Sequence, residues 1–244
     1  RHADRRTPSG ARGTHAMSAT RQLPRAIVFD MDGTLLDTEV LALRAWEEAA
    51  AAQGTTFGED LARALIGKNF ADSSSHVRAH FARSDAGDYP VDAVLDGWHR
   101  SYERIVEREG VAIKHGAPEL LAWLAAAGIP CAVATSTRQA SARKKLADAG
   151  LLVHFKAVIG GDDVARGKPQ PDIYLAAAKA LATPPVDCLA IEDSETGYRA
   201  AHAAGMAVIL VPDLMVPNEH LLALSPRIVQ SLAHVQQSLE ALAQ

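Results

Sequence analysis

The sequence predicts an α/β fold built on a parallel sheet, and three observations predict it. Short apolar runs recur along the chain and alternate with segments rich in alanine and leucine. Residues 39–109, which follow the first run, show helical spacing and no strand pattern. With 244 residues, 48% of them hydrophobic, the chain is long enough to bury a substantial core.

The apolar runs have the length and composition of buried strands. In the first run, Ile27, Val28 and Phe29 follow one another without a polar residue, as expected for a strand covered on both faces. We expect strands over residues 26–29, 129–134, 157–159, 188–191 and 208–211.

The segments between these runs have helical composition, and several end at a glycine. We expect helices over residues 118–127, 138–149, 171–181 and 196–204, and a last helix with the apolar stripe Leu232, Val235, Leu239 and Leu242. Strands that alternate with helices of this length indicate a Rossmann-like parallel sheet core with helices on both faces.

Residues 39–109 are predicted to form an inserted α-helical cap domain. Its apolar residues at helical spacing are Phe70, Val77, Phe81, Val91, Val94, Leu95, Trp98, Tyr102 and Ile105. The insert leaves the sheet after the first strand and returns before the second. Two chain crossings, near residues 37–40 and 107–115, therefore join the cap to a core of residues 23–38 and 110–244, and such a connection can hinge.

Residues 1–22 lack apolar periodicity, and we expect them to be disordered. They are either a tag before a native start near Met17 or an N-terminal extension, for which an organelle transit peptide is the sharper alternative.

Composition excludes several classes of function. A net charge of −4 and a pI near 6.2 provide no broad positive field, so no nucleic acid partner is expected. No apolar run approaches the roughly 20 residues that cross a bilayer, so no membrane association is expected. Cys131 and Cys188 lie in strand-like runs, which suits reduced thiols and a cytoplasmic protein. The oligomeric state is open, with a monomer or weak dimer expected.

Polar side chains follow four of the predicted strands, where ligands bind in open parallel sheets. They are Asp30, Asp32, Gly33 and Thr34 after the first, Thr135, Ser136 and Thr137 after the second, Lys168 after the third, and Glu192 and Asp193 after the fourth. Taken singly, each set has an ordinary structural explanation as a turn, a cap or a solvated side chain.

Taken together, four acids, a lysine and paired hydroxyls in one crevice would repel or remain unsatisfied unless a cation and an anionic ligand balanced them. The pattern therefore indicates a divalent metal and a phosphate. Oxygen ligands without cysteine or histidine suit a hard ion, and Mg²⁺ is the simplest choice. His76 and His80 lack the glutamate of a zinc-protease helix, and no GxGxxG or Walker motif is present.

Four segments carry a resemblance to a known family. DMDGTLLDTE, TST, GKPQPD and IEDS resemble, in order, the four motifs of the haloacid dehalogenase superfamily, in the branch of beta-phosphoglucomutase and phosphoglycolate phosphatase, whose helical cap follows the first motif. The resemblance covers nearly all of residues 25–212.

The resemblance implies that Asp30 is a nucleophile that forms an aspartyl phosphate and that Asp32 is the general acid and base. Because dehalogenases lack an acid at the Asp32 position, it also argues against dehalogenation.

The same resemblance implies the ligand contacts of the site. Mg²⁺ would bind the Asp30 carboxylate, the Asp32 main-chain carbonyl and Asp193, with Glu192 supporting it directly or through water. The Thr135 hydroxyl, the Ser136 amide at a helix start and the Lys168 ammonium would hold the phosphoryl oxygens, beside the Gly33 and Thr34 turn. Asp172 is expected to be a helix cap.

Two departures from the mutase pattern favour hydrolysis. Trp46 matches a mutase tryptophan, but Ala42 stands where the mutase histidine lies and Phe70 where its arginine grips a second phosphate. We expect a phosphatase for a small phosphorylated metabolite, of sugar phosphate or phosphoglycolate type. A phosphomutase and a noncatalytic phosphate sensor remain alternatives.

Four further residues have two open interpretations. Lys68 and Asn69 either contact the substrate from the cap or form an ordinary polar turn between helices. Arg138 and Gln139 either contact the leaving group or are solvated residues at a helix start.

Overall fold

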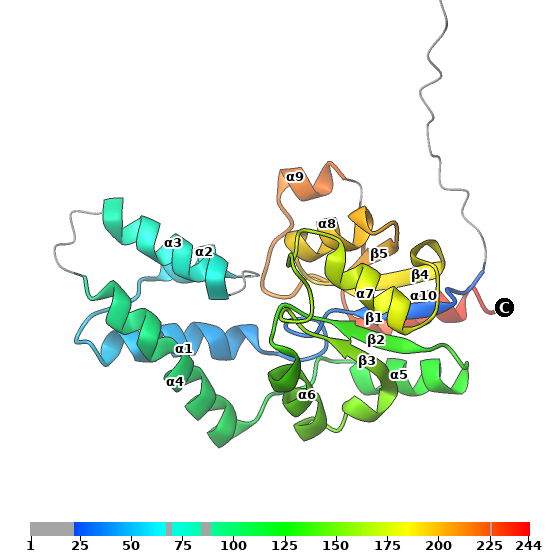
Figure 1. The fold of residues 1–244 in the computed structure, drawn as a ribbon, viewed down its shortest axis with the longest axis horizontal. Helices are drawn as coiled ribbons and strands as arrows, with labels where there is room; N and C mark the ends of the chain where they lie inside the picture. Colours follow the sequence, from blue (N-terminus) through cyan, green and yellow to red (C-terminus); the bar gives the residue numbers. More distant parts are fainter. Residues whose placement is uncertain (1–21, 67–69, 84–88, 225) are drawn as a thin grey trace, which may run out of the picture.

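The computed structural model describes residues 22–66, 70–83, 89–224 and 226–244, so Lys68 and Asn69 lie outside the described residues. Its core is a parallel sheet of six strands in the order β3-β2-β1-β4-β5-β6 (Figure 1). The strands are β1 (Ala26–Phe29), β2 (Cys131–Ala134), β3 (Phe155–Ile159), β4 (Cys188–Glu192), β5 (Ala207–Leu210) and β6 (Arg227–Ile228). The predicted Rossmann-like α/β class is confirmed, with β6 as the unpredicted strand.

Two layers of helices cover the sheet, because successive side chains of a strand point to opposite faces. Ile27 and Phe29 of β1 lie in the apolar cluster of one face, and Ala26 and Val28 lie in that of the other. The first face packs against α5 (Ala117–Ala126), α6 (Gln139–Asp148) and α10 (Leu232–Glu240), and the second against α7 (Asp172–Ala180) and α8 (Glu195–Ala203).

Short elements complete the core: two 3-10 turns, η1 (Leu152–His154) and η2 (Pro185–Asp187), and a helix of one turn, α9 (Glu219–Leu222). In the C-terminal stripe, Leu232, Val235 and Leu239 are buried as predicted, and Leu242 lies beyond the end of α10. Cys131 and Cys188 are both free and buried. None of the described helices combines the length and apolar character that crossing a bilayer requires.

Four helices follow β1 and pack around an apolar cluster of their own, to one side of the sheet (Figure 1). They are α1 (Glu39–Ala51), α2 (Glu59–Leu65), α3 (Phe70–Arg83) and α4 (Val91–Glu109). The cluster includes the predicted Val77, Val94 and Leu95, and Trp46 stacks within it on Phe57 at 5.2 Å between ring centroids. No strand occurs in the described part of residues 39–109, as the sequence predicts.

The two chain crossings between these helices and the sheet are paired with each other. Leu36 bridges Ile113 in antiparallel fashion, and the Lys114 amide donates to the Leu35 carbonyl at 2.9 Å. Arg44 on α1 makes two hydrogen bonds to Glu109 on α4, at 2.6 and 2.9 Å. The crossings therefore form one short ribbon at the position where the sequence predicts a hinge.

Gly116 tests the packing of α5 on α10. Its φ is +85°, and a Cβ there would lie 2.5 Å from the Ala233 amide nitrogen, whereas Gly128, with φ of +69°, has nothing within 4 Å of its Cβ position. We expect Gly128→Ala to lower the free energy of unfolding by about 1 kcal/mol through the left-handed conformation alone. Gly116→Ala should lower the free energy of unfolding by at least ~1 kcal/mol more than Gly128→Ala, because α10 must shift to make room for the methyl group.

Urea denaturation of the two purified variants measures this difference. Equal losses at Gly116 and Gly128 would show that α10 accommodates a methyl group at no cost, contrary to the packing described.

Candidate active site

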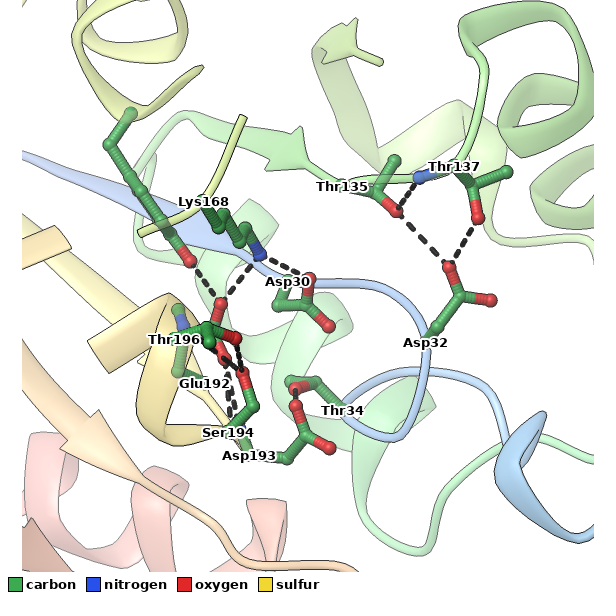
Figure 2. Close-up of polar contacts among 12 residues, drawn as sticks. Asp30, Asp32, Thr34, Thr135, Thr137, Lys168, Glu192, Asp193, Ser194 and Thr196 are labelled. Atoms are coloured by element: carbon green, nitrogen blue, oxygen red, sulfur yellow. Dashed lines mark hydrogen bonds and ion pairs between the residues drawn. The ribbon is translucent and has the colours of Figure 1, made fainter. Parts of the chain in front are cut away.

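The polar residues predicted from four strand ends do converge at the carboxyl edge of the sheet (Figure 2). Asp30 follows β1, and its amide donates to the Ile191 carbonyl of β4 at 2.9 Å. From β1 the strands follow in sequence order towards β3 on one side of the sheet, and from β4 they follow in sequence order towards β6 on the other side. The boundary between β1 and β4 is therefore a topological switch point, where open sheets of this type bind ligands.

Lys168 joins two of the carboxylates. Its ammonium lies 2.5 Å from Asp30 Oδ1 and 2.6 Å from Glu192 Oε1, and its side chain is 5% exposed. Burial alone would lower the pKa of Lys168, but Asp30 and Glu192 outweigh it and raise the pKa. Lys168 is therefore a permanent cation at the centre of the site.

Glu192 is fully buried and its carboxylate is saturated with donors. Oε1 accepts from Lys168 and from the Tyr174 hydroxyl at 2.7 Å, and Oε2 accepts from the Asp193 amide and from the amide and hydroxyl of Ser194 at 3.0 to 3.1 Å. A Cβ at Gly197 would lie 1.7 Å from Oε1, so only glycine fits there. Glu192 thus fixes Lys168 and the start of α8, and has little capacity left for a further ligand.

Asp193 has a different environment from its neighbour. The Thr34 hydroxyl donates to Asp193 Oδ1 at a long 3.5 Å. A Cβ on Gly33 would lie only 2.3 Å from Asp193 Oδ2. Gly33, with φ of +88°, is therefore required both for the turn after β1 and for the approach of Asp193. The pKa of Asp193 is raised well above its usual range by burial and by the charges of Asp30 and Glu192.

Asp30, Glu192 and Asp193 fit a hard cation. Each offers an oxygen, and the three atoms lie within 4.8 Å of one another. Burial raises the pKa of Asp30 to about 8, with Glu192 and Asp32 adding to it and Lys168 opposing. Three buried carboxylates face one lysine, and the donor set is oxygen only, which is the chemistry that Mg²⁺ favours. Asp30 and Asp193 have the oxygens for it, and Glu192 supports them.

Asp32 points away from this cluster, towards the loop after β2 (Figure 2). Its Oδ2 accepts from the hydroxyls of Thr135 at 3.1 Å and Thr137 at 2.7 Å, and its Oδ1 accepts from Lys145 at 3.1 Å. Burial would raise the pKa of Asp32, but the Lys145 charge and the hydrogen bonds from Thr137, Lys145 and Thr38 outweigh it and lower the pKa. The pKa values of two aspartates only two residues apart are thus shifted in opposite directions.

The loop after β2 differs from the prediction in one respect. Ser136 is exposed, but α6 begins only at Gln139, so the expectation that the Ser136 amide lies at a helix start is wrong. The Gln139 amide donates to Asp162 at 2.8 Å, and its side chain donates to Asp163 at 2.9 Å. Gln139 therefore has a structural role here, and Arg138 is exposed.

Two site residues were not singled out from the sequence. Tyr174 looks like an apolar helix position, and Lys145 is one of two adjacent lysines in α6. Thr137 was expected among the polar residues after the second strand, but without the contact with Asp32 that the structure shows. No local signal separates Lys145 from Lys144. The expectation that Asp172 caps a helix is wrong: the N-cap of α7 is Pro171, and Asp172 is the first helical residue, whose carboxylate pairs with Arg166 at 2.9 Å.

The fold and the site together define a class: a Rossmann-like α/β hydrolase with an acidic, lysine-bridged active site. A family model described as haloacid dehalogenase-like hydrolase matches residues 24–205. The chain belongs to this family, as the resemblance of its four motifs predicts, and its place there is that of a phosphomonoester hydrolase.

Three curated relatives share most of the chain. Protein CbbY of Rhodobacter capsulatus is 33% identical, over 89% of this chain and 98% of its own length. Hexitol phosphatase A of Escherichia coli is 34% identical, over 77% and 82%. Beta-phosphoglucomutase of Bacillus subtilis is 29% identical, over 76% and 82%.

A solved structure, CbbY from Rhodobacter sphaeroides in complex with phosphate, matches with a TM-score of 0.71 and 30% identity, covering 87% of this chain and 96% of that one.

The charge imbalance of the site predicts a specific dependence of stability on pH. Asp30 and Asp193 bind protons more tightly in the folded protein than in the unfolded chain, so raising the pH from about 5 to 8 should destabilise the metal-free protein. Carboxyl groups whose pKa is lowered on folding, such as Asp32, are already ionised in both states over this window. The stabilisation given by Mg²⁺ should therefore increase across the same window.

Thermal melting in EDTA and in Mg²⁺ at several pH values measures this. Asp193→Asn should raise the metal-free melting temperature and abolish the Mg²⁺ effect, whereas the exposed-surface control Asp148→Asn should change neither. A Mg²⁺ effect that stays undiminished in Asp193→Asn would contradict the assignment.

Proposed function

We propose that this chain is a Mg²⁺-dependent phosphatase that hydrolyses a small phosphorylated metabolite, of sugar phosphate or phosphoglycolate type, through an aspartyl phosphate on Asp30. The observation that carries the proposal is the contact of Lys168 with both Asp30 and Glu192, next to Asp193. This contact brings a nucleophile, a fixed cation and oxygen ligands for a metal together at one buried position.

The residues divide the reaction as follows. An Asp30 oxygen forms a bond to phosphorus while the bond to the ester oxygen breaks, and Asp32 gives that oxygen a proton. Water then attacks phosphorus, Asp32 takes its proton, and the bond to Asp30 breaks to release phosphate. Lys168 orients Asp30 and stabilises charge on the phosphoryl oxygens. Asp30, Asp193 and the Asp32 carbonyl would hold Mg²⁺, which would neutralise the charge of two anions that otherwise repel.

Thr135 has a double role in this scheme. A hydroxyl has a single proton to donate, and in the described structure Thr135 donates it to Asp32 while accepting from the Thr137 amide at 3.1 Å. To hold a phosphoryl oxygen, Thr135 must release Asp32. Substrate binding would therefore free the acid and base from one of its restraints.

Phe70 supports hydrolysis over phosphate exchange between two positions of a sugar. It stands where the mutase pattern has an arginine, and its ring stacks on Trp98 at 4.8 Å and lies 4.1 Å from the His99 ring. This position contributes aromatic surface to the cap and no cation for a second phosphate. We also propose that residues 23–38 and 110–244 form the catalytic core and that residues 39–109 form a cap that closes over it.

The nucleophile assignment is tested with 4-nitrophenyl phosphate. We expect Mg²⁺-dependent release of phosphate by the wild type and a loss of at least about 10³-fold in Asp30→Asn, because an amide cannot attack phosphorus. Asp148→Asn is the matched control and should retain wild-type turnover. Robust turnover by Asp30→Asn would rule out this nucleophile, and phosphate binding without turnover by the wild type would favour the sensor.

The mutase alternative requires its own assay. Incubation with beta-glucose 1-phosphate should release inorganic phosphate faster than it yields glucose 6-phosphate, because Ala42 and Phe70 replace the two mutase side chains. Efficient formation of glucose 6-phosphate would overturn the preference for hydrolysis. A panel of phosphorylated sugars and phosphoglycolate then identifies the leaving group that the cap accepts.

A further inference from the structure

We infer that Lys145, on α6, is a positioning residue that holds the Asp32 carboxylate on the cap side of the site, and that Tyr102 of α4 holds Lys145 in turn. The inference rests on the proposed function, because it gives Lys145 a task in proton transfer by Asp32. It links the acid and base of the core to a helix of the inserted segment.

The burial of Lys145 sets it apart from its neighbour. Its side chain is 14% exposed, whereas that of Lys144 is 77% exposed and pairs with Asp148 on the same helix. A lysine is buried to this degree when its ammonium has a partner, and here the partner is Asp32 Oδ1 at 3.1 Å. Side chains on a helix lean towards its N-terminus, and the N-terminus of α6 lies at the carboxyl edge of the sheet.

Tyr102 connects this ammonium to the interior of the inserted helices. Lys145 Nζ lies 5.0 Å from the centroid of the Tyr102 ring, within the range of a cation–π contact. The Tyr102 ring stacks on Trp98 at 5.1 Å, and the Trp98 indole donates to the Ala42 carbonyl of α1 at 3.1 Å. The Trp98 ring also packs against Trp46 at 5.3 Å. A stack of rings thus ends on the cation that holds Asp32.

A count of donors explains why Lys145 matters during the reaction. Asp32 is held by Thr135 and Thr137 on Oδ2 and by Lys145 on Oδ1, and Thr38 adds a further hydrogen bond. When Thr135 turns to the phosphoryl group, Lys145 and Thr137 remain, one on each oxygen. The charged contact of Lys145 on Oδ1, opposite Thr137 on Oδ2, fixes the rotation of the carboxylate, whereas the neutral hydroxyls of Thr137 and Thr38 would restrain it less. A proton donor must lie about 2.6 to 3.2 Å from the leaving oxygen, so this rotation decides whether Asp32 reaches it.

The test compares two leaving groups. Phenolate is strongly basic, with a conjugate acid of pKa about 10 like that of tyrosine, and needs the proton from Asp32. The more acidic 4-nitrophenol leaves without it. We expect Lys145→Met to lower kcat/KM for phenyl phosphate about tenfold more than for 4-nitrophenyl phosphate. The control Lys144→Met should leave kcat/KM unchanged for both substrates. Because kcat/KM includes the bond-breaking step, slow release of phosphate does not mask the effect.

Two further variants separate positioning from a general structural effect. In an Asp32→Asn background, adding Lys145→Met should change kcat/KM by less than about twofold, because the two residues act as one unit. Tyr102→Leu should reproduce the leaving-group selectivity of Lys145→Met with a smaller amplitude. Circular dichroism and melting confirm that each variant is folded, and Lys145→Gln replaces Lys145→Met if the latter is not.

Three outcomes overturn the inference. They are an equal loss on both substrates, a further loss of about tenfold in the Asp32→Asn background, and a rise in KM with kcat unchanged, which would make Lys145 a substrate contact. Turnover that survives Asp30→Asn defeats the proposed function and this inference with it. Wild-type turnover that depends on Asp30, without leaving-group selectivity in Lys145→Met, defeats the inference alone.

Discussion

The buried contact of Lys168 with Asp30 and Glu192 is the interaction on which the rest of the structure depends. It places one cation among three carboxylates that are almost wholly removed from water. Removing one partner of a buried ion pair costs about 3–5 kcal/mol, because the remaining charge is left uncompensated. Lys168 comes from the loop after β3, whereas Asp30 and Glu192 come from β1 and β4, so the same contact joins three segments of the core at the carboxyl edge of the sheet.

The residues around this contact show how the backbone is shaped to keep it. Glu192 accepts from the amides of Asp193 and Ser194, directly before α8, so the approach to this helix and the position of Lys168 are fixed by one carboxylate. Gly197 and Gly33 leave space for Glu192 and Asp193, each at a distance that no Cβ could occupy. The site is therefore part of the framework that holds β1, β4 and α8 together. Its precision comes from these rigid elements.

The sequence was sufficient for the fold and for the residues that meet at the strand ends, for a simple physical reason. Parallel strands must end at the same edge, so polar residues directly after β1, β2 and β4 can be brought together without knowing any helix position. Strand β6 was not predicted, because its two residues are exposed and do not form an apolar run. Lys145 and Tyr174 were not predicted as site residues, because their contacts depend on how α6 and α7 are rotated against the sheet. Phe70 was noted as a departure from a motif, but its packing on Trp98 needed the structure.

Asp30 and Asp32 show how one turn serves two kinds of chemistry. Asp30 lies among like charges in a buried cluster, and its pKa is raised to about 8, so its negative charge is costly until a cation arrives. Asp32 lies among a lysine and hydroxyl donors, and its pKa is lowered. These directions belong to the metal-free protein and are opposite to those that a nucleophile and a proton donor require. The proposed roles therefore need a cation that keeps Asp30 ionised and a bound phosphoryl group whose negative charge raises the pKa of Asp32. Three carboxylates around one lysine leave a surplus of negative charge, so a divalent cation bound there would relieve the repulsion that folding leaves in place, and an anionic phosphoryl group could then approach.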